Sequence, residues 1–450
     1  MSAEEYKDLQ NFEEDKSCAS TEISSVMEET KDPPTKPKKK VQKPQKVRRS
    51  NRIAEMKKKA LQDKKIKELE MKAKLKVGYV FEEDLSLHKS HRVSHVERPE
   101  RIWSIYLQLL KAGLIDNMYK VDGDLINDEN ILLCHSEEYL MKFNKVVGID
   151  DDAQEPAPAK RNKNMYHFQF DTYENKWSNH CAKLSAGCVI ETVDALYTDY
   201  IKSGFCIVRP PGHHAHGSSA SGFCFLNNVA IAAKYAQSKY GVKKVCIFDW
   251  DVHFGDGTSS IFKSDPSVLF ISTHRYEGGA FYPSSPLGGE DNVGTDEGEG
   301  FNINIPFNKE GMGNDEYIHV CENLVFPVIE KFEPELIFIS AGFDSAEGDP
   351  LGGFSLTPAG YAYMCQRIMN LCQETSKPKM IAVLEGGYNL ESISNSSEAV
   401  VRVLQGEKLP IESMNATQTV EQMRENAKPD TEALEVVERV KSNIGKFWDL

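Results

Sequence analysis

Short apolar runs alternate with segments of helical periodicity along most of this chain. Continuous apolar strands separated by helices are typical of a parallel sheet that helices cover on both faces. The pattern therefore predicts an α/β fold. We expect strands in the runs KVGYVF, GFCIVRP, KKVCIFDWD, VLFISTH, NINIPF, ELIFISAGFD and KMIAVLEGG. We expect helices over 99–113, 177–198, 226–240, 314–332, 357–374 and 391–404.

Polar residues whose side chains can bind a metal or take part in catalysis follow four of these runs. In parallel sheets, ligands bind in the crevice beyond the carboxyl ends of the strands. Each residue has an ordinary explanation when taken alone, such as a helix cap or a hydrogen-bonded loop histidine. Their joint appearance at strand ends favours a functional site. They are His213 and His214 in PGHHAHG, Asp249, Asp251 and His253 in DWDVHFG, Asp344 in AGFDS, and Tyr388 in EGGYN.

Two carboxylates and one imidazole from this set suit a divalent metal. Residues two apart on a strand share a face, so Asp251 and His253 can act together, and Asp344 adds a second carboxylate. Oxygen and nitrogen ligands suit zinc, iron or manganese, and the absence of a sulfur ligand argues against a purely structural zinc site. Three protein ligands leave a position for water, which favours hydrolysis of an amide or ester.

The remaining strand-end residues supply proton transfer and charge stabilisation. His213 and His214 are candidates for moving protons, with Asp249 and Asp256 as the carboxylates that orient them. Tyr388 is a candidate donor of a hydrogen bond to a developing oxyanion.

The composition indicates the cellular compartment in which we expect the protein. No stretch approaches the roughly 20 apolar residues that span a bilayer, and the start, MSAEEYKD, does not look like a secretory signal. Ten cysteines without a CxxC pair suggest reduced thiols inside a cell. We expect no membrane partner.

The first 76 residues differ from the rest. Residues 1–32 carry three Lys against ten Asp/Glu, and residues 33–76 carry 18 Lys/Arg against four Asp/Glu. From the total of −14, this leaves −21 for residues 77–450. We expect residues 1–76 to be a disordered tail, acidic and then basic. Lys38–Lys40 with Arg48, Arg49 and Arg52 predict a nuclear import signal or a contact for nucleic acid or chromatin, and a solvated tail is the alternative. We expect the protein in the nucleus, with possible shuttling to the cytoplasm, and no direct nucleic-acid binding beyond this tail.

The ordered motifs resemble the catalytic domain of the class II (Hda1-like) histone deacetylases. They are HVERPERI, HSEEYL, VRPPGHHA, SGFCFLNNVAIAA, DWDVHFGDGT, STHRYEGGAFYP, SAGFDSAEGDPLGG and LEGGYN. The resemblance implies an arginase/deacetylase-like three-layer fold whose eight-stranded, mainly parallel sheet has helices on both faces. It also implies zinc-dependent removal of acetyl groups from lysine. We place the catalytic domain at 77–405 and a helical extension, packed on it, at 406–450.

The resemblance also implies roles for individual residues. The zinc ligands fall on Asp251, His253 and Asp344. His214 matches the general base and acid, His213 its electrostatic partner, and Tyr388 the residue that polarises the acetyl carbonyl. The acyl-lysine tunnel falls on Phe223 and Tyr282 as aromatic walls, with Gly222 beside them. Asp249 and Ser272 match contacts of a structural potassium ion.

Four positions depart from the family pattern. Phe254 stands where a second histidine is usual, and we expect a packing change without loss of metal. Asp256 stands where class II members usually have Asn, and its charge should raise the basicity of His214. Tyr282 replaces the usual Phe and adds a hydroxyl to the tunnel rim. Val96 replaces a proline, and we expect this change to have little effect.

Leu351 is informative about the class of substrate. A family relative that acts on acetylated polyamines carries an acidic residue at this point of GDPLGG, so Leu351 favours acetyl-lysine in proteins. Histone tails are the expected substrate, with a corepressor complex as a possible partner. The alternatives are non-histone proteins such as tubulin, acetylpolyamines, a two-manganese ureohydrolase of arginase type, and a catalytically weak acyl-lysine-binding scaffold.

Overall fold

The computed structural model describes residues 77–90, 95–145, 171–374 and 379–450. The expected disordered tail, residues 1–76, lies outside the described residues, and so does the expected import signal within it.

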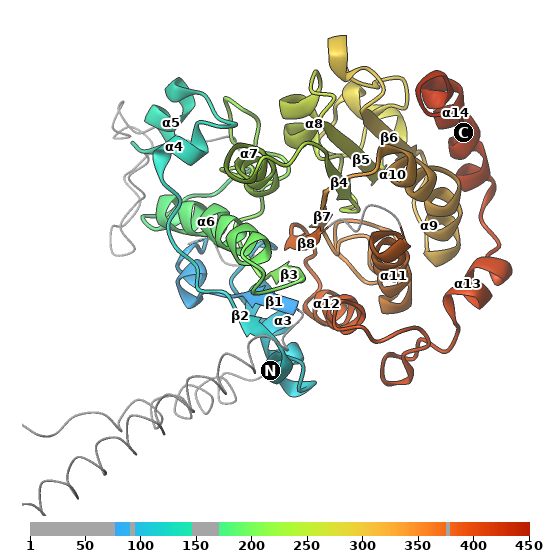
Figure 1. The fold of residues 1–450 in the computed structure, drawn as a ribbon, viewed down its shortest axis with the longest axis horizontal. Helices are drawn as coiled ribbons and strands as arrows, with labels where there is room; N and C mark the ends of the chain where they lie inside the picture. The colour runs from blue at the N-terminus through green and yellow to red at the C-terminus, as the bar shows by residue number, and fades with distance from the viewer. Residues whose placement is uncertain (1–76, 91–94, 146–170, 375–378) are drawn as a thin grey trace, which may run out of the picture. The chain divides into compact units, whose positions relative to one another are not determined.

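Eight strands form one sheet in the order β2-β1-β3-β8-β7-β4-β5-β6 (Figure 1). The strands are β1 Val77–Val80, β2 Tyr119–Lys120, β3 Ser203–Cys206, β4 Val245–Asp249, β5 Val268–Arg275, β6 Asn302–Phe307, β7 Leu336–Ala341 and β8 Lys379–Leu384. All pairings between these eight strands are parallel, so the expected α/β sheet is confirmed and is parallel throughout. The two-residue strand β2 has no counterpart among the predicted runs, because two residues carry no periodicity.

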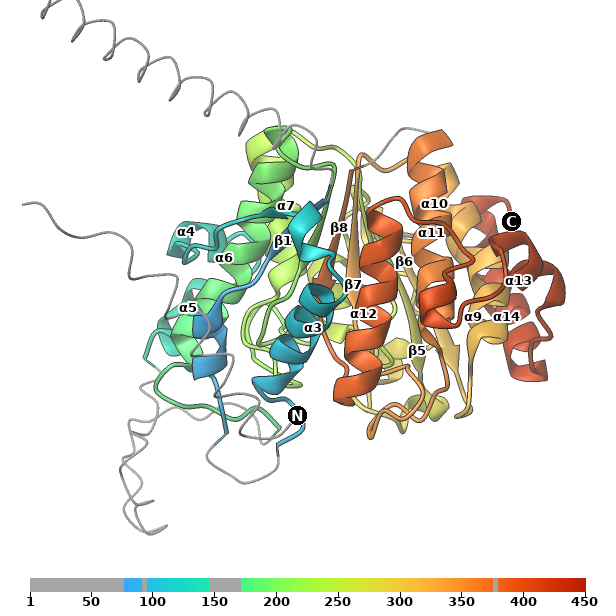
Figure 2. The same cartoon turned by 90° about the horizontal axis from the view of Figure 1, so that it is seen from below.

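Helices cover both faces of this sheet. They are α3 Glu100–Lys111, α4 Asp128–Ile131, α5 Glu137–Phe143, α6 Ser178–Tyr197, α7 Asn228–Tyr240, α8 Asp256–Phe262, α9 Asn314–Val320, α10 Phe326–Phe332, α11 Pro358–Glu374, α12 Leu390–Leu404, α13 Val420–Asn426 and α14 Thr431–Trp448. Helices α6 and α7 lie on one face, and α3, α11 and α12 lie on the other (Figures 1 and 2). The expected three-layer arrangement is confirmed.

The predicted helices form close to their expected bounds, and side-chain caps begin several of them. Asn227 caps α7 by accepting from the Ala230 N–H, and Asn389 caps α12 in the same way. The predicted helix 314–332 is interrupted by a π-helical turn at Cys321–Val325. Pro327, at the start of α10, has no N–H to donate into that turn, which accounts for the irregularity.

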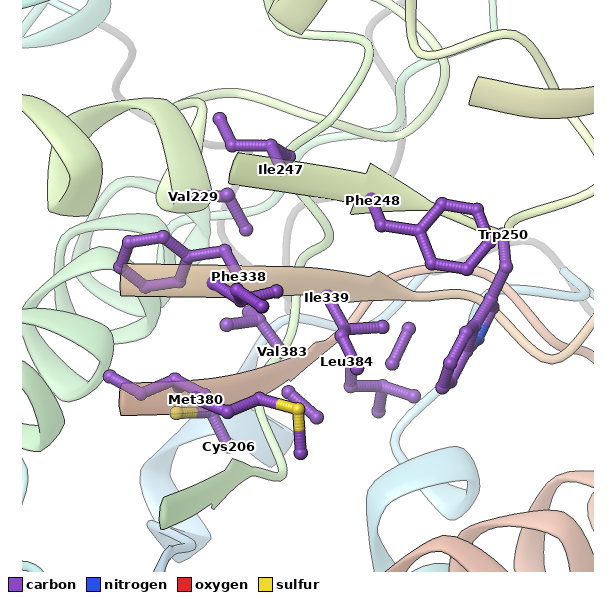
Figure 3. Close-up of a cluster of buried hydrophobic side chains, with 14 of the residues drawn as sticks. Cys206, Val229, Ile247, Phe248, Trp250, Phe338, Ile339, Met380, Val383 and Leu384 are labelled. Atoms are coloured by element: carbon purple, nitrogen blue, oxygen red, sulfur yellow. The ribbon is translucent and has the colours of Figure 1, made fainter. Parts of the chain in front are cut away.

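The central strands are buried on both faces. Phe248 and Trp250 pack beside Ile339 and Leu384 at the ends of neighbouring strands (Figure 3). This packing fixes the strand ends from which the candidate site is built. The cysteines whose side chains the structure describes are free thiols, namely Cys134, Cys181, Cys188, Cys206, Cys224, Cys246, Cys321 and Cys365. No described helix combines the length and apolar character that a bilayer crossing requires.

Helix α14 packs beside β6 and α9 at one end of the sheet. Its buried face includes Val436, Val440 and Ile444, and Asp430 caps its first turn. The Trp448 indole N–H donates to the Gly300 carbonyl oxygen at 2.7 Å.

Candidate active site

Three potential metal ligands meet where β4 and β7 end side by side. Asp251 and His253 follow β4, and Asp344 follows its neighbour β7. The ligand atoms of these three residues lie within 4.8 Å of one another, and all three residues are buried. The Nδ1 atom of His253 lies 3.0 Å from Asp251 Oδ1 and 3.1 Å from Asp344 Oδ2. The structure therefore brings together the three residues that the strand-end pattern singled out.

The surroundings of this cluster fit a bound cation. A Cβ atom at Gly342 would lie 2.1 Å from Asp251 Oδ2, and one at Gly386 would lie 2.2 Å from Asp344 Oδ2, so both glycines make room for the carboxylates. Burial and the negative charge of Asp251 raise the pKa of Asp344 to about 7. A divalent ion would offset this repulsion, and two carboxylates with one imidazole are suitable ligands for zinc.

Each histidine of the HH pair has its own carboxylate partner. His213 Nδ1 lies 3.0 Å from Asp249 Oδ2, and His214 Nδ1 lies 2.7 Å from Asp256 Oδ1. The two imidazole rings are adjacent, with centroids 4.0 Å apart. The structure thus places Asp249 and Asp256 where they orient His213 and His214, respectively.

The environment of His214 keeps its imidazole neutral near pH 7. Burial lowers the pKa of His214 to about 4, and His213 acts in the same direction, whereas the hydrogen bond to Asp256 opposes both. Asp256 thus raises the basicity as expected, but burial outweighs it. With a hydrogen at Nδ1 facing Asp256, the ring can accept a proton at Nε2.

Tyr388 is fixed by contacts with residues outside its own loop. The Arg101 guanidinium lies 4.9 Å from the centre of its ring, and Arg101 also donates to the carbonyl oxygens of Glu385 and Gly387 at 2.5 and 2.6 Å. The Tyr388 N–H donates to Asp349 Oδ2 at 2.7 Å. Burial raises the pKa of Tyr388 well above its usual value, so the hydroxyl keeps its proton and can donate a hydrogen bond.

These groups open on one cavity of about 290 Å³. Its lining consists of Asp171, His214, Gly222, Phe223, His253, Phe281, Tyr282, Leu351 and Tyr388. The Phe223 ring meets that of Tyr388 edge-on at 5.9 Å, and the His214 ring meets that of Tyr282 at 5.1 Å. Phe223 has a φ of 67°, a left-handed conformation that a large side chain rarely adopts without a functional reason.

Sequence reasoning missed several residues that build this site. Two of them, Asp171 and Ser221, contact the Tyr282 hydroxyl. The Tyr282 hydroxyl donates to Asp171 Oδ2 at 2.5 Å and lies 3.1 Å from Ser221 Oγ. Phe281 stacks on the metal-ligand candidate His253, with ring centroids 5.3 Å apart. Asp171 lies in no strand-end motif, so no signal identified it. Arg101 and Asp349 lie within the motifs HVERPERI and EGDPLGG, where their charge offered a signal.

The two residues predicted to contact potassium are neighbours across the sheet. Asp249 on β4 pairs in register with Ser272 on β5. Ser272 Oγ also lies 2.9 Å from His274 Nδ1, and potassium binding stays a prediction. Phe254 is buried and its ring packs against that of His274, with centroids 5.0 Å apart.

The fold and this site define an α/β protein of the arginase/deacetylase-like class: a parallel eight-stranded sheet with an Asp-His-Asp cluster at its carboxyl edge. Residues 95–404 match the histone deacetylase domain. The chain belongs to the histone deacetylase family.

Individual relatives agree with this assignment. Histone deacetylase 15 of Arabidopsis thaliana is 42% identical over 340 residues, which cover 74% of this chain and 58% of that protein. Histone deacetylase HDA1 of Candida albicans is 38% identical over 395 residues, covering 83% of this chain and 44% of the relative. Polyamine deacetylase HDAC10 of Danio rerio is 40% identical over 334 residues, with coverages of 74% and 48%. The chain thus spans about half the length of these relatives.

A solved structure shares the fold. The crystal structure of the HDA15 HD domain matches with a TM-score of 0.72 and 37% identity, covering 83% of this chain and 95% of the other. The expected relationship to the Hda1-like histone deacetylases is confirmed.

Proposed function

We propose that this protein is a zinc-dependent hydrolase that removes acetyl groups from lysine side chains of proteins. One observation carries the proposal: the Asp-His-Asp cluster, the His214–Asp256 pair and Tyr388 converge on a single aromatic-walled cavity. Family membership supports a deacetylase, and the donor set of two carboxylates and an imidazole supports zinc.

Asp251, His253 and Asp344 would hold the metal. When bound there, zinc supplies Lewis-acid polarisation of the acyl carbonyl and a lowered pKa for water. His214 accepts a proton from the attacking water at Nε2 and later donates it to the leaving amine. Asp256 holds the Nδ1–H of His214, 2.7 Å away, and so fixes the tautomer that this exchange requires.

The other cavity residues bind and orient the acyl-lysine. The Tyr388 hydroxyl donates to the carbonyl oxygen, whose negative charge grows as the amide is attacked. Phe223 and Tyr282 enclose the aliphatic lysine chain. Gly222 also lines the cavity and lets the His214 ring pack against its backbone, because a Cβ there would lie 2.4 Å from His214 Cδ2. These contacts exclude bulk water from the reacting amide.

The direct test is hydrolysis of an acetyl-lysine peptide by the purified full chain with zinc supplied. Free lysine peptide and acetate, measured by mass spectrometry, are the expected products. No turnover would contradict the proposal and favour the scaffold alternative. Release of urea from a guanidino substrate would favour the arginase-type alternative instead.

Substitution of Leu351 tests the choice between protein and polyamine substrates. Leu351 lines the cavity, and Polyamine deacetylase HDAC10 is among the relatives of this chain. Leu351→Glu should raise the ratio of kcat/KM for acetylspermidine to that for an acetyl-lysine peptide by about 5- to 10-fold, because a carboxylate there attracts the second amine of the polyamine. Leu351→Gln, which has similar size without the charge, serves as the control. A ratio that Leu351→Glu leaves unchanged would refute this assignment.

Charge supports a histone tail as the protein substrate. Residues 77–450 carry a net charge of −21, which favours encounter with Lys-rich segments. A corepressor complex would supply such substrates. Non-histone proteins such as tubulin are the alternative, which side-by-side assays on acetylated histone and tubulin peptides distinguish.

We also propose nuclear localisation directed by the basic tail. Deletion of 36–52 should move a fluorescently tagged protein from the nucleus to the cytoplasm while leaving peptide turnover at the full-chain level. Replacement of the segment by a Gly/Ser linker of equal length controls for spacing. Nuclear retention of both variants would reject this role for the segment.

A further inference from the structure

A second histidine contacts the carboxylate that orients His214. His216 lies in the same loop, two residues after His214. Asp256 Oδ1 lies 2.7 Å from His214 Nδ1, and Asp256 Oδ2 lies 3.1 Å from His216 Nε2. One carboxylate is therefore held between two imidazoles, and the mechanism proposed above uses only one of them.

The hydrogens of this trio can be assigned. Burial alone would raise the pKa of Asp256, but the hydrogen bonds from His214 and His216 outweigh it and hold the pKa below its usual range. An ionised carboxylate only accepts hydrogen bonds, so His214 carries a hydrogen at Nδ1 and His216 carries one at Nε2.

The outer side of His216 is held in a way that preserves this arrangement. His216 Nδ1 lies 2.9 Å from Ser260 Oγ, and Ser260 Oγ lies 2.8 Å from the Gly257 carbonyl oxygen. The Ser260 hydroxyl can donate to Nδ1 of a neutral ring, or accept from Nδ1–H and donate to Gly257 instead. The Nε2–H bond to Asp256 is therefore kept in either protonation state of His216.

The side chains of His214 and His216 differ in how much of their surface is exposed. The side chain of His214 is 4% exposed and lines the cavity, whereas that of His216 is 31% exposed and does not line it. His216 is also fixed through its backbone, since its N–H donates to the Ser219 carbonyl oxygen at 2.9 Å. A change at His216 can therefore reach the reacting atoms through Asp256 without altering the cavity wall.

We propose that His216 is a positioning residue for the reaction, an inference that rests on the proposed function. A carboxylate held through one oxygen can swing about its side-chain bonds. Asp256 Oδ1 accepts from His214 and from the Gly257 N–H, 3.0 Å away, and only the hydrogen bond from His216 reaches Oδ2. This bond fixes the carboxylate plane and, through it, the ring orientation and tautomer of His214. Misorientation of a general base slows the chemical step and leaves substrate binding intact.

Substitution of His216 tests this role in the full chain with zinc supplied. His216→Ala should lower kcat on an acetyl-lysine peptide by about 3- to 10-fold, the effect of one lost hydrogen bond, and change KM less than twofold. His216→Gln, whose side-chain amide can donate to Asp256, should restore most of kcat. His319→Ala, at a partly buried histidine on α9 outside the site, should leave both constants at wild-type values.

A double-mutant cycle shows whether His216 acts through Asp256. In an Asp256→Asn background, His216→Ala should lower kcat no further, because the carboxylate it positions is gone. Equal losses from His216→Ala in both backgrounds, or a rise in KM in place of a fall in kcat, would overturn the proposal.

A spectroscopic measurement separates this proposal from the proposed function. In protein labelled with ¹⁵N-histidine, His214 should be the Nδ1–H tautomer in the wild type and a tautomer mixture in His216→Ala. Unchanged His214 signals would overturn the positioning role. Absence of peptide turnover by the wild type would contradict the proposed function, and the tautomer measurement would still decide the role of His216.

Discussion

Tyr388→Phe is expected to lower kcat on an acetyl-lysine peptide by about 100- to 1,000-fold and to leave the bound metal in place. The lost hydroxyl is the donor to the developing oxyanion, and removal of one such donor costs about this much. The ring keeps its contacts, since Arg101 lies 4.9 Å from its centre and the Phe223 ring lies 5.9 Å away. The hydrogen bond from the backbone N–H of residue 388 to Asp349 is also kept.

Steady-state kinetics and metal analysis of the same preparation check this result. Tyr363→Phe is a matched control, because Tyr363 is buried, donates its hydroxyl to Glu322 Oε1 at 2.7 Å and does not line the cavity. The control should turn over peptide at the wild-type rate. Wild-type turnover by Tyr388→Phe would remove Tyr388 from the mechanism, and loss of metal would mean that it has a structural role.

Asp344→Asn is expected to abolish both metal binding and turnover. Asn has nearly the same size and can still accept the Val252 N–H, now 2.8 Å from Asp344 Oδ1, but it lacks the charge that a divalent cation requires. Metal affinity should fall by more than about 100-fold, since even partners beyond the direct ligands contribute 10- to 100-fold. Metal titration followed by calorimetry measures this loss.

Thermal unfolding of metal-free protein separates this effect from misfolding. Burial and the charge of Asp251 outweigh the hydrogen bond and charge of His253 and raise the pKa of Asp344 to about 7, so its ionisation costs stability at pH 7 and removal of its charge should not destabilise the metal-free chain. Metal-free Asp344→Asn should unfold at or above the temperature of the metal-free wild type. Asp291→Asn, at an exposed position, should bind metal normally. Full metal binding by Asp344→Asn would contradict its assignment as a ligand.

The sequence predicted the layers of the fold because short continuous apolar runs alternate with segments of helical periodicity. It did not predict the order of the strands, so the proximity of Asp344 to Asp251 depended on the general rule that parallel strands end at one edge. In the structure β7 lies directly beside β4, which places the two carboxylates together. Strand β2 was not predicted because two residues are too few to form a recognisable sequence pattern.

The parts of the site that sequence reasoning missed come from outside the strand ends. Arg101 reaches Tyr388 from α3, and Asp171 reaches Tyr282 from a segment before α6. Such contacts depend on tertiary packing. Asp171 left no local pattern, and Arg101 was visible only as a charge within HVERPERI, which did not indicate its partner. The sequence also could not show how deeply the site residues are buried. The charge of Asp256 was evident from the sequence, but the burial that lowers the pKa of His214 was not.

Metal content and turnover of one preparation test the proposed centre most directly. Purified full chain should contain one zinc ion per molecule by elemental mass spectrometry. Chelation should abolish hydrolysis of the acetyl-lysine peptide, and one equivalent of zinc should restore it. Two manganese ions per chain, or undiminished turnover after the metal has been removed, would contradict a single metal held by Asp251, His253 and Asp344.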